Sequence, residues 1–252
     1  MDESIGVIVT VYKRPQNLAE QLKAIRAQTV KPKQIMIWHN VVPGVKLDPR
    51  VVEGLTVVSA NPNMGVWPRF MIGLELNTKY VCVFDDDTVP GTRWFENCLL
   101  TMKTHRGVLG TVGVTFKHLT RQGWVKGDGW TRVGWPTPNE QPVEVDIVGH
   151  SWFFERDWIR AYANEPRCGG QTTCGEDYHL SVSAQKQLGL KTYVPAHPKD
   201  HKEWWGSVKG MELGTDQVAL YRINGENDKR IATHAAYVEG GWKPLVSRRG
   251  DV

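Results

Sequence analysis

The chain has 252 residues, of which 40% are hydrophobic and 23% are charged, and its formal net charge is +4. This composition is typical of a folded globular protein and excludes a disordered or collagen-like chain. No apolar run approaches the roughly 20 residues that span a bilayer, and the positive charge is spread along the chain rather than clustered as in a nucleic-acid-binding protein.

Apolar segments alternate with helical patterns through the first hundred residues. Ile5–Val11 is almost wholly apolar and rich in β-branched residues, which indicates a strand buried on both faces. Leu18, Leu22 and Ile25 then fall on one face of a helix. Further strands are expected at 34–38, 55–59 and 80–84, and a helix at 69–76.

This alternation predicts an α/β fold with a mostly parallel central sheet and helices on both faces. Ligands of such sheets bind beyond the carboxyl ends of the strands. The strand ends at 10–14, 39–40 and 85–87 should therefore open onto one crevice.

The pattern changes after Thr104. Strands are expected at 108–116 and 143–148, and the Gly- and Trp-rich stretch between them has no helical periodicity. A loop or hairpin insertion of this length is often functional. Its tryptophans and those at 204–205 either stack on sugar rings or cap the core. A helix to about Leu188, a strand at 191–194 and one or two C-terminal helices complete the expected order.

The four cysteines point to buried thiols rather than to a zinc site. Cys82 lies in an apolar strand-like run and Cys98 in an expected helix. Cys168 and Cys174 lack the paired spacing of a zinc site, and a disulfide between them is the less favoured alternative. Because the acidic start MDES does not resemble a secretory signal, we expect a cytoplasmic protein with reduced thiols.

The strongest motif is Asp85-Asp86-Asp87 at the end of the strand at 80–84. Three consecutive carboxylates repel one another, so a cation is expected to compensate them. Mg²⁺ and Mn²⁺ prefer oxygen ligands and often keep ligand phosphates in their coordination shell. The motif therefore predicts a metal and diphosphate site, and the alternative is a solvated acidic turn or helix start.

Five segments occur in an order that resembles the nucleotide-sugar glycosyltransferases of the GT-A fold: VIVTVYKRP, IWHN, NMGVWPRF, VFDDDT and CGEDYHL. The DDD triplet matches their DxD motif. The pattern is most similar to the exostosin-like group (family 64), with family 2 as the wider class, through Thr10-Val11-Tyr12, Asn40, Asn63, Arg69, Asp85 to Thr88, Glu176-Asp177 and Pro244-Leu245. The resemblance covers most of the chain. It implies one GT-A domain over 1–252, with a nucleotide-binding half at 1–104 and an acceptor-binding half at 105–252.

The resemblance also implies which residues bind the nucleotide sugar. Thr10, Tyr12 and Arg14 would lie near the nucleotide, and Asn40 would contact its base. Asn63 is also expected among the residues that bind the nucleotide sugar.

The remaining donor-side residues would surround the diphosphate. Arg69 would hold it, because a guanidinium suits bidentate pairing, and the alternative is a surface arginine at a helix start. Asp85 would face the ribose and share a Mn²⁺ or Mg²⁺ ion with Asp87. Asp86 would lie between the nucleotide and the sugar.

Glu176 and Asp177 match the acidic pair that faces the acceptor in GT-A enzymes. The purely structural alternative is that the helix dipole favours carboxylates in a first turn. Asp177 would either take the proton of the acceptor hydroxyl or stabilise positive charge on the sugar, so it does not set the stereochemistry. Many GT-A enzymes take a further metal ligand from a C-terminal histidine, for which His197 and His201 are candidates, while His150 would line the sugar pocket.

These observations predict a metal-dependent glycosyltransferase that moves a sugar from a nucleoside-diphosphate sugar, with UDP favoured, to a glycan hydroxyl. No nucleic-acid partner and no transmembrane segment are expected. One alternative is a sugar-nucleotide nucleotidyltransferase, but TVYKRP lacks the glycines of its phosphate loop. The other is a non-catalytic carbohydrate-binding protein, which would leave the DDD and GED triplets without a purpose. Exostosin-like enzymes have a membrane anchor and stem, and we see no pattern for either in this sequence. We therefore expect a microbial or viral glycan rather than a proteoglycan as acceptor.

Overall fold

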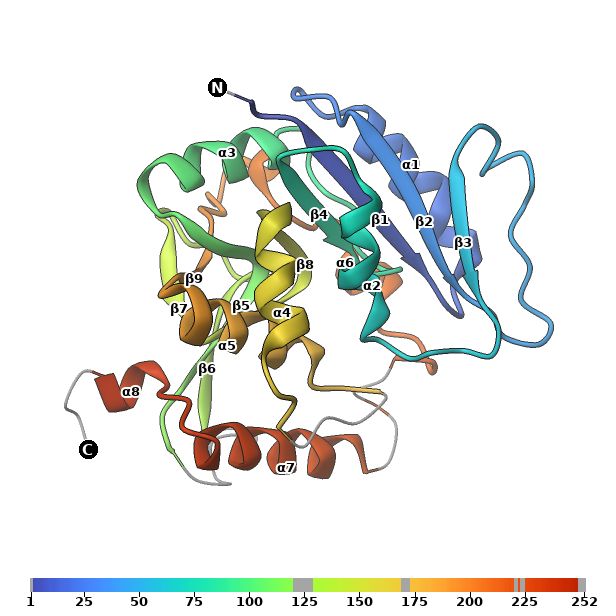
Figure 1. Cartoon of the computed structure of the whole chain (residues 1–252). Helices are drawn as coiled ribbons and strands as arrows, with labels where there is room; N and C mark the ends of the chain where they lie inside the picture. The colour runs from blue at the N-terminus through green and yellow to red at the C-terminus, as the bar shows by residue number, and fades with distance from the viewer. Residues whose placement is uncertain (1, 120–128, 169–172, 220–221, 223–224, 249–252) are drawn as a thin grey trace.

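The computed structural model describes residues 2–119, 129–168, 173–219, 222 and 225–248. Over these residues a nine-stranded sheet forms the centre of the molecule, in the order β3-β2-β1-β4-β8-β5-β9-β7, with β6 paired to β5. Helices cover both faces of this sheet, with α2, α4 and α5 on one side and α1 and α6 on the other (Figure 1). The predicted α/β fold is confirmed.

The first half of the sheet is wholly parallel. Its strands are β1 (Ile5–Val11), β2 (Gln34–Asn40), β3 (Thr56–Ala60) and β4 (Tyr80–Phe84). All seven residues of β1 are buried, as expected of a strand with neighbours on both sides and helices on both faces. The predicted strands and their order along the chain are confirmed here, and their carboxyl ends lie at one edge of the sheet (Figure 1).

The helices of the first half differ in one place from the prediction. A 3₁₀ turn, Pro15–Asn17, opens α1 (Leu18–Arg26), and α3 (Trp94–Thr104) follows β4. The expected helix at 69–76 is instead a short α2 (Pro68–Met71) that continues as a 3₁₀ turn, Ile72–Glu75. Gly73 in that turn packs so closely that a Cβ there would lie 2.7 Å from Cδ1 of Ile159.

The second half of the sheet is mixed. Long β5 (Gly107–Phe116) and β8 (Ile147–Glu155) pair antiparallel, and β8 also pairs antiparallel with β4, which joins the two halves. β9 (Lys191–Val194) runs parallel to β5, and β7 (Val143–Val145) runs antiparallel to β9.

The single strand expected at 143–148 is two strands, β7 and the start of β8. Asp146 separates them and is fully buried. Its carboxylate accepts the backbone N–H groups of Phe116 at 2.7 Å and Leu245 at 2.6 Å. The chain thus changes sheet neighbours at a residue whose side chain is held by two other segments.

The Gly- and Trp-rich insertion contains a hairpin strand. β6 (Trp130–Gly134) pairs antiparallel with β5, with Trp130 opposite Phe116. Trp124 lies outside the described residues. Trp135 is buried, as are Trp38 and Trp94.

The remaining helices are short apart from two. They are α4 (Ile159–Asn164), α5 (Glu176–Leu188), α6 (Gly210–Leu213), α7 (Glu226–Glu239) and α8 (Leu245–Arg248), with 3₁₀ turns at Arg156–Trp158 and Lys202–Trp204. None of the described helices is both long and apolar enough to cross a membrane. All four cysteines are free, and Cys82 and Cys98 are buried as predicted.

Candidate functional site

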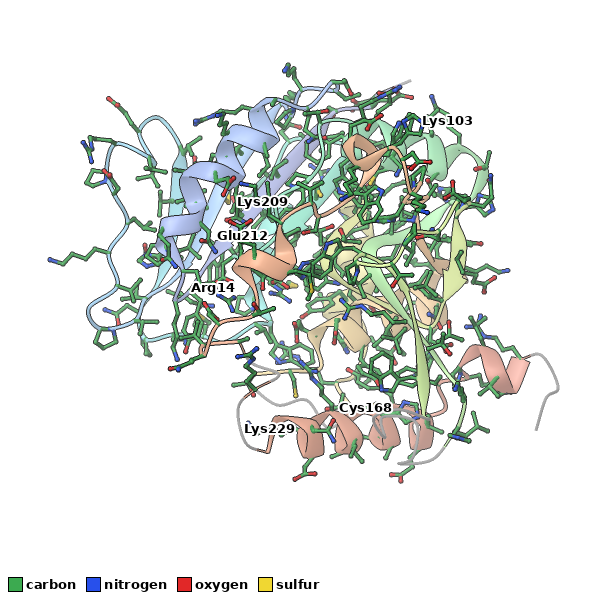
Figure 2. The ribbon with its side chains drawn as sticks, turned by 180° about the vertical axis from the view of Figure 1, so that it is seen from behind. Arg14, Lys103, Cys168, Lys209, Glu212 and Lys229 are labelled. Carbon is green, nitrogen blue, oxygen red and sulfur yellow. The ribbon has the colours of Figure 1, made fainter. Side chains whose placement is uncertain are left out.

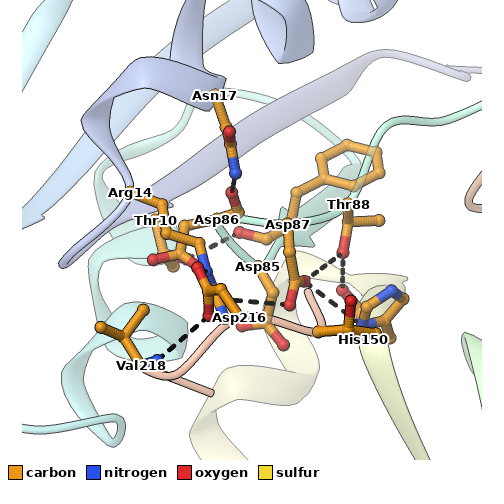
Figure 3. Close-up of polar contacts among 12 residues, drawn as sticks. Thr10, Arg14, Asn17, Asp85, Asp86, Asp87, Thr88, His150, Asp216 and Val218 are labelled. Atoms are coloured by element: carbon orange, nitrogen blue, oxygen red, sulfur yellow. Dashed lines mark hydrogen bonds and ion pairs between the residues drawn. The ribbon is translucent and has the colours of Figure 1, made fainter. Parts of the chain in front are cut away.

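The three aspartates at 85–87, called the acidic turn below, follow β4 at the carboxyl edge of the sheet. Several elements hold this turn (Figure 3). Asn17 donates to one of its backbone carbonyls at 2.9 Å, and Gln21 donates to another at 2.6 Å. Thr88 donates its hydroxyl to the backbone carbonyl of His150 at 2.8 Å. The turn is therefore fixed between the start of α1 and the strand β8.

Asp85, Asp87 and His150 form a group that could hold a metal ion, because one ligand atom from each lies within 4.8 Å of the others. Nδ1 of His150 is 3.5 Å from Oδ1 of Asp87. Burial lowers the pKa of His150 to about 4, which keeps the ring neutral and able to bind a cation.

The backbone and the ring of His150 are both constrained. Its φ is 74°, in the left-handed region that a residue with a Cβ occupies at a cost of about 1–3 kcal/mol. Its ring stacks on that of Trp135, with 4.6 Å between the centroids. Strained residues of this kind cluster at functional sites.

Arg14 faces the acidic turn from the end of β1. Its guanidinium donates to Asp86 at 2.7 Å and to Asp87 at 3.3 Å. From its other edge it donates two parallel hydrogen bonds to Asp216, at 2.9 and 2.7 Å. Arg14 thus links the acidic turn to the segment that follows α6 (Figure 3).

Arg69 is buried, not on the surface, and its guanidinium contacts two carboxylates from different elements. It donates to Asp85 at the end of β4 and, at 2.5 Å, to Glu176 at the start of α5. Its guanidinium carbon lies 4.3 Å from the ring centroid of Trp152. In this structure Arg69 therefore connects the acidic turn to α5.

The site carries an excess of negative charge. Two guanidinium groups, those of Arg14 and Arg69, face five carboxylates: Asp85, Asp86, Asp87, Glu176 and Asp216. Burial raises the pKa of Asp85 and of Asp87 to about 6, because their charge is only partly compensated. Two carboxylates and one neutral imidazole suit Mn²⁺. Mg²⁺ prefers oxygen ligands, which the two carboxylates provide, so the residues present fit either cation.

The two carboxylates at the start of α5 point to different places. Gly175, at φ 98°, precedes them in a left-handed conformation. Glu176 is buried against Arg69, and burial raises its pKa while Arg69 opposes the shift. Asp177 is half-buried at a cavity, where burial raises its pKa and the positive charge of Arg230 lowers it.

The cavity next to Asp177 has a volume of about 220 Å³. Its floor is apolar and comes from β5 and β8. Its polar lining residues are Arg132, His150, Asp177 and Arg230. Because His150 also belongs to the group of metal-binding candidates, the cavity connects that group to Asp177.

The other residues expected to bind the nucleotide hold the carboxyl edge of the sheet together. Thr10 donates its hydroxyl to the carbonyl of Phe84 at 2.9 Å and so ties β1 to β4. Asn40 donates to the carbonyl of Gly65 at 2.9 Å, and exposed Asn63 accepts the N–H of Gly65 at 2.7 Å. These contacts place both asparagines beside the end of β2. Tyr12 is half-buried at the end of β1.

The histidines expected as metal ligands lie elsewhere. His197 is fully buried, with Nδ1 2.8 Å from the carbonyl of Pro195 and Nε2 accepting the N–H of Gly206 at 3.2 Å. His201 is largely exposed and pairs with Glu203 at 3.0 Å. Among the residues that the structure describes, His150 is the histidine beside the aspartates.

Sequence reasoning did not identify His150 as a candidate metal ligand and missed Asp216 altogether. His150 reaches the acidic turn because β8 pairs with β4. That pairing joins residues far apart in the chain and leaves no local pattern. Asp216 lies 202 residues from Arg14 in the chain, so the local sequence held no signal for their pairing.

No family model matches this chain, and no curated protein does. Among solved structures it is similar to S. aureus TarS, a family 2 glycosyltransferase, at 16% identity and a TM-score of 0.52, over 77% of this chain and 37% of that one. TarS 1-349 in complex with UDP matches at 16% identity with a TM-score of 0.52, over 77% of this chain and 58% of that one. Its complex with UDP-GlcNAc matches at 16% identity with a TM-score of 0.50, over 79% of this chain and 60% of that one.

The chain has a glycosyltransferase GT-A fold. It spans 37 to 60% of the length of the TarS chains that it matches. The likeness supports a glycosyltransferase fold and does not support the exostosin-like group that the sequence pattern favoured.

Proposed function

We propose that this protein is a metal-dependent glycosyltransferase that moves a sugar from a UDP-sugar to a hydroxyl group of a glycan. One observation carries the proposal: the cavity beside Asp177 is lined by His150, which lies against the aspartates of the acidic turn. A cation site can stabilise a departing diphosphate and a carboxylate can accept the proton of an acceptor hydroxyl, so the two together suit sugar transfer from a nucleotide donor. The UDP and UDP-GlcNAc complexes of TarS support the choice of donor.

On the donor side, Asp85, Asp87 and His150 would hold Mn²⁺ or Mg²⁺. Such an ion, when bound, supplies a Lewis acid that stabilises negative charge on the departing diphosphate. Arg14 keeps the carboxylates of the acidic turn oriented through its contacts with Asp86 and Asp87.

The nucleotide would lie beyond the carboxyl ends of β1 and β2, as ligands of such sheets do. Thr10, Tyr12, Asn40 and Asn63 are found at these ends. The base and the ribose would rest against this edge.

On the acceptor side, Asp177 would take the proton of the acceptor hydroxyl while the oxygen forms its bond to the sugar and the bond from the sugar to UDP breaks. Burial raises the pKa of Asp177, which makes its carboxylate a stronger base, and Arg230 keeps the charged form favoured. Glu176 is turned toward Arg69 and acts as a positioning residue.

The test is UDP binding with and without metal. Calorimetry should show UDP binding at least about tenfold tighter with Mn²⁺ than with EDTA, and Asp87→Asn should remove most of this difference. Asp157→Asn, at an exposed residue paired with Arg156 outside the site, is the matched control. Equal UDP affinity in Mn²⁺ and EDTA would contradict metal-dependent transfer.

Assays on the same preparation distinguish a glycosyltransferase from the two alternatives, a nucleotidyltransferase and a carbohydrate-binding protein. A nucleotidyltransferase would form a nucleotide sugar from a nucleoside triphosphate and a sugar phosphate, whereas a glycosyltransferase releases UDP from a UDP-sugar. A carbohydrate-binding protein would do neither and would not bind UDP.

A further inference from the structure

Two amide side chains at the start of α1 hold the backbone of the acidic turn. Asn17 and Gln21 are four residues apart, so they lie on the same face of the helix. The NH₂ group of Asn17 donates to the carbonyl of Asp86 at 2.9 Å (Figure 3). The NH₂ group of Gln21 donates to the carbonyls of Asp85 and Thr88 at 2.6 and 2.9 Å. One helix face therefore holds the acidic turn along its whole length.

The amide group of Gln21 is itself in an unfavourable place. Gln21 is fully buried, and its Oε1 has no hydrogen-bond partner among the residues that the structure describes. A buried acceptor without a partner destabilises a fold, and a methionine of similar length would avoid that cost. The amide is therefore explained by the two carbonyls to which its NH₂ group donates. These two hydrogen bonds also fix its orientation, because a flipped amide would bring Oε1 against the carbonyl oxygens.

Thr88 extends this contact to β8. Its hydroxyl donates to the carbonyl of His150 at 2.8 Å, and the backbone N–H of Asp85 donates to the same carbonyl at 3.3 Å. The two residues whose carbonyls Gln21 holds are thus the two that hold His150. Asp85, Asp87 and His150 are the candidate cation ligands. The hydrogen bonds of Gln21 end on backbone atoms, and that backbone carries or holds all three ligands.

We propose that Gln21, acting with Thr88, is a positioning residue that sets Asp85, Asp87 and His150 in their cation-binding arrangement before the cation arrives. The proposal rests on the cation site of the proposed function. In the absence of a cation the neighbouring carboxylates repel one another, which favours an opened turn. Neutral amide donors oppose this opening without cancelling the negative charge that attracts the cation. A cation that meets a prearranged turn loses less affinity to rearrangement of its ligands.

The experiment measures the affinity for Mn²⁺. Free Mn²⁺ is counted by electron paramagnetic resonance as the full chain is titrated, first without nucleotide and then with UDP, against a blank that contains UDP alone. Gln21→Met keeps the length of the side chain and removes both hydrogen bonds. Groups that orient metal ligands from outside the coordination shell contribute about 10- to 100-fold to metal affinity, so Gln21→Met should bind Mn²⁺ about tenfold more weakly or worse. Thr88→Val, which removes the hydroxyl contact with His150, should also weaken Mn²⁺ binding.

Gln28→Met is the matched control. Gln28 is also fully buried, its NH₂ group donates to the carbonyl of Gly91 at 2.7 Å, and its Oε1 accepts the N–H of Phe95 at 3.0 Å. Because these contacts lie beyond the acidic turn, Gln28→Met should lower the stability in urea at least as much as Gln21→Met and keep the Mn²⁺ affinity of the wild type. A purely structural role of Gln21 predicts a loss of stability alone.

The outcomes distinguish the positioning role from the proposed function. Equal Mn²⁺ affinity in the wild type and in Gln21→Met would overturn the positioning role and leave the proposed function standing. If Gln28→Met weakens Mn²⁺ binding as much as Gln21→Met does, the cause is general loosening of the fold, and the positioning role is wrong. If Gln21→Met does not fold, Thr88→Val replaces it, and Mn²⁺ affinity equal to that of the wild type would overturn the proposal. A wild type that binds no Mn²⁺ in either titration would contradict the cation site itself, and the positioning role with it.

Discussion

Arg69 stabilises two buried carboxylates that belong to different elements. If it is replaced by Met, Asp85 and Glu176 lose their shared cation while staying buried. Breaking a buried ion pair by removing one partner costs about 3–5 kcal/mol, so we expect Arg69→Met to lower the free energy of unfolding by about that amount in urea at pH 7. Adding Glu176→Gln should restore part of the loss.

The control for Arg69 is Arg106→Met, which breaks an ion pair with a half-exposed arginine and should cost about 0–1 kcal/mol. A variant Arg69→Met that unfolds like the wild type but loses UDP affinity would show that the guanidinium serves the diphosphate, as the family pattern implied.

Asp177 can be tested through the rate of transfer. Asp177→Asn keeps the shape of the side chain and removes its charge, so the rate should fall by about 100- to 10,000-fold, the usual contribution of a general base. UDP affinity should stay unchanged, because the lost interaction forms in the transition state. Transfer rate and UDP affinity are measured on one preparation. A rate close to that of the wild type would reduce Asp177 to a helix-start carboxylate.

Glu176→Gln is the comparison for Asp177. Because Glu176 is buried against Arg69, its loss should appear mainly as lower stability and only secondarily as a lower rate. The roles of the two neighbouring carboxylates would then be distinguished, because Asp177→Asn lowers mainly the transfer rate and Glu176→Gln lowers mainly the stability.

At the scale of elements, α6 lies over the acidic turn and is held from both ends. Lys209 contacts Glu20 on α1, and Asp216 pairs with Arg14. Figure 2 shows Arg14, Lys209 and Glu212 around this helix. The two glycines of the segment make close contacts: a Cβ at Gly210 would lie 2.7 Å from Nε2 of His150, and one at Gly214 would lie 2.5 Å from Oδ2 of Asp87.

These distances predict that Gly214→Ala weakens metal-dependent UDP binding. The added methyl group would push on Asp87, and overpacking of this kind costs about 1–3 kcal/mol, which would be about 5- to 150-fold if it were all expressed in affinity. The φ of Gly214 is −104°, so alanine fits the backbone itself. Met211→Ala, at an exposed side chain on the same helix, is the calorimetric control. Unchanged affinity in Gly214→Ala would show that α6 moves away when the ligands bind.

At the scale of the whole molecule, the sequence predicted what local patterns determine. The buried strand β1, the acidic turn after β4 and the paired carboxylates at the start of α5 are each visible in a few consecutive residues. The place of β8 between β4 and β5 is not, because it depends on antiparallel pairing between strands that lie far apart in the chain.

That long-range pairing decides much of the candidate site. It brings His150 to the aspartates and Trp152 beneath Arg69. The burial of Arg69 follows from the same packing, which a helix-start arginine in a sequence does not reveal. Residues that act through distant partners therefore had to be assigned from the structure.

Acid stability is a property of the whole molecule to which buried His197 contributes. Its Nδ1–H donates to Pro195 and its Nε2 accepts from Gly206, an arrangement that requires the neutral ring. Burial lowers the pKa of His197 in the folded state to about 4, below the value of about 6.5 in an unfolded chain. The stabilisation is therefore complete above pH 6.5 and is lost as the pH falls toward 4.

The test compares the wild type with His197→Gln, which lacks the titrating ring. Between pH 7 and pH 5 the free energy of unfolding of the wild type should fall by about 2 kcal/mol more than that of the variant, because only the wild-type unfolded chain gains a proton at this position. Urea unfolding at several pH values measures both, and the other histidines and carboxylates cancel in the comparison. His197→Gln is expected to be less stable at pH 7, where Pro195 and Gly206 lose hydrogen bonds to the ring. Parallel pH profiles for the two proteins would contradict a neutral, buried His197.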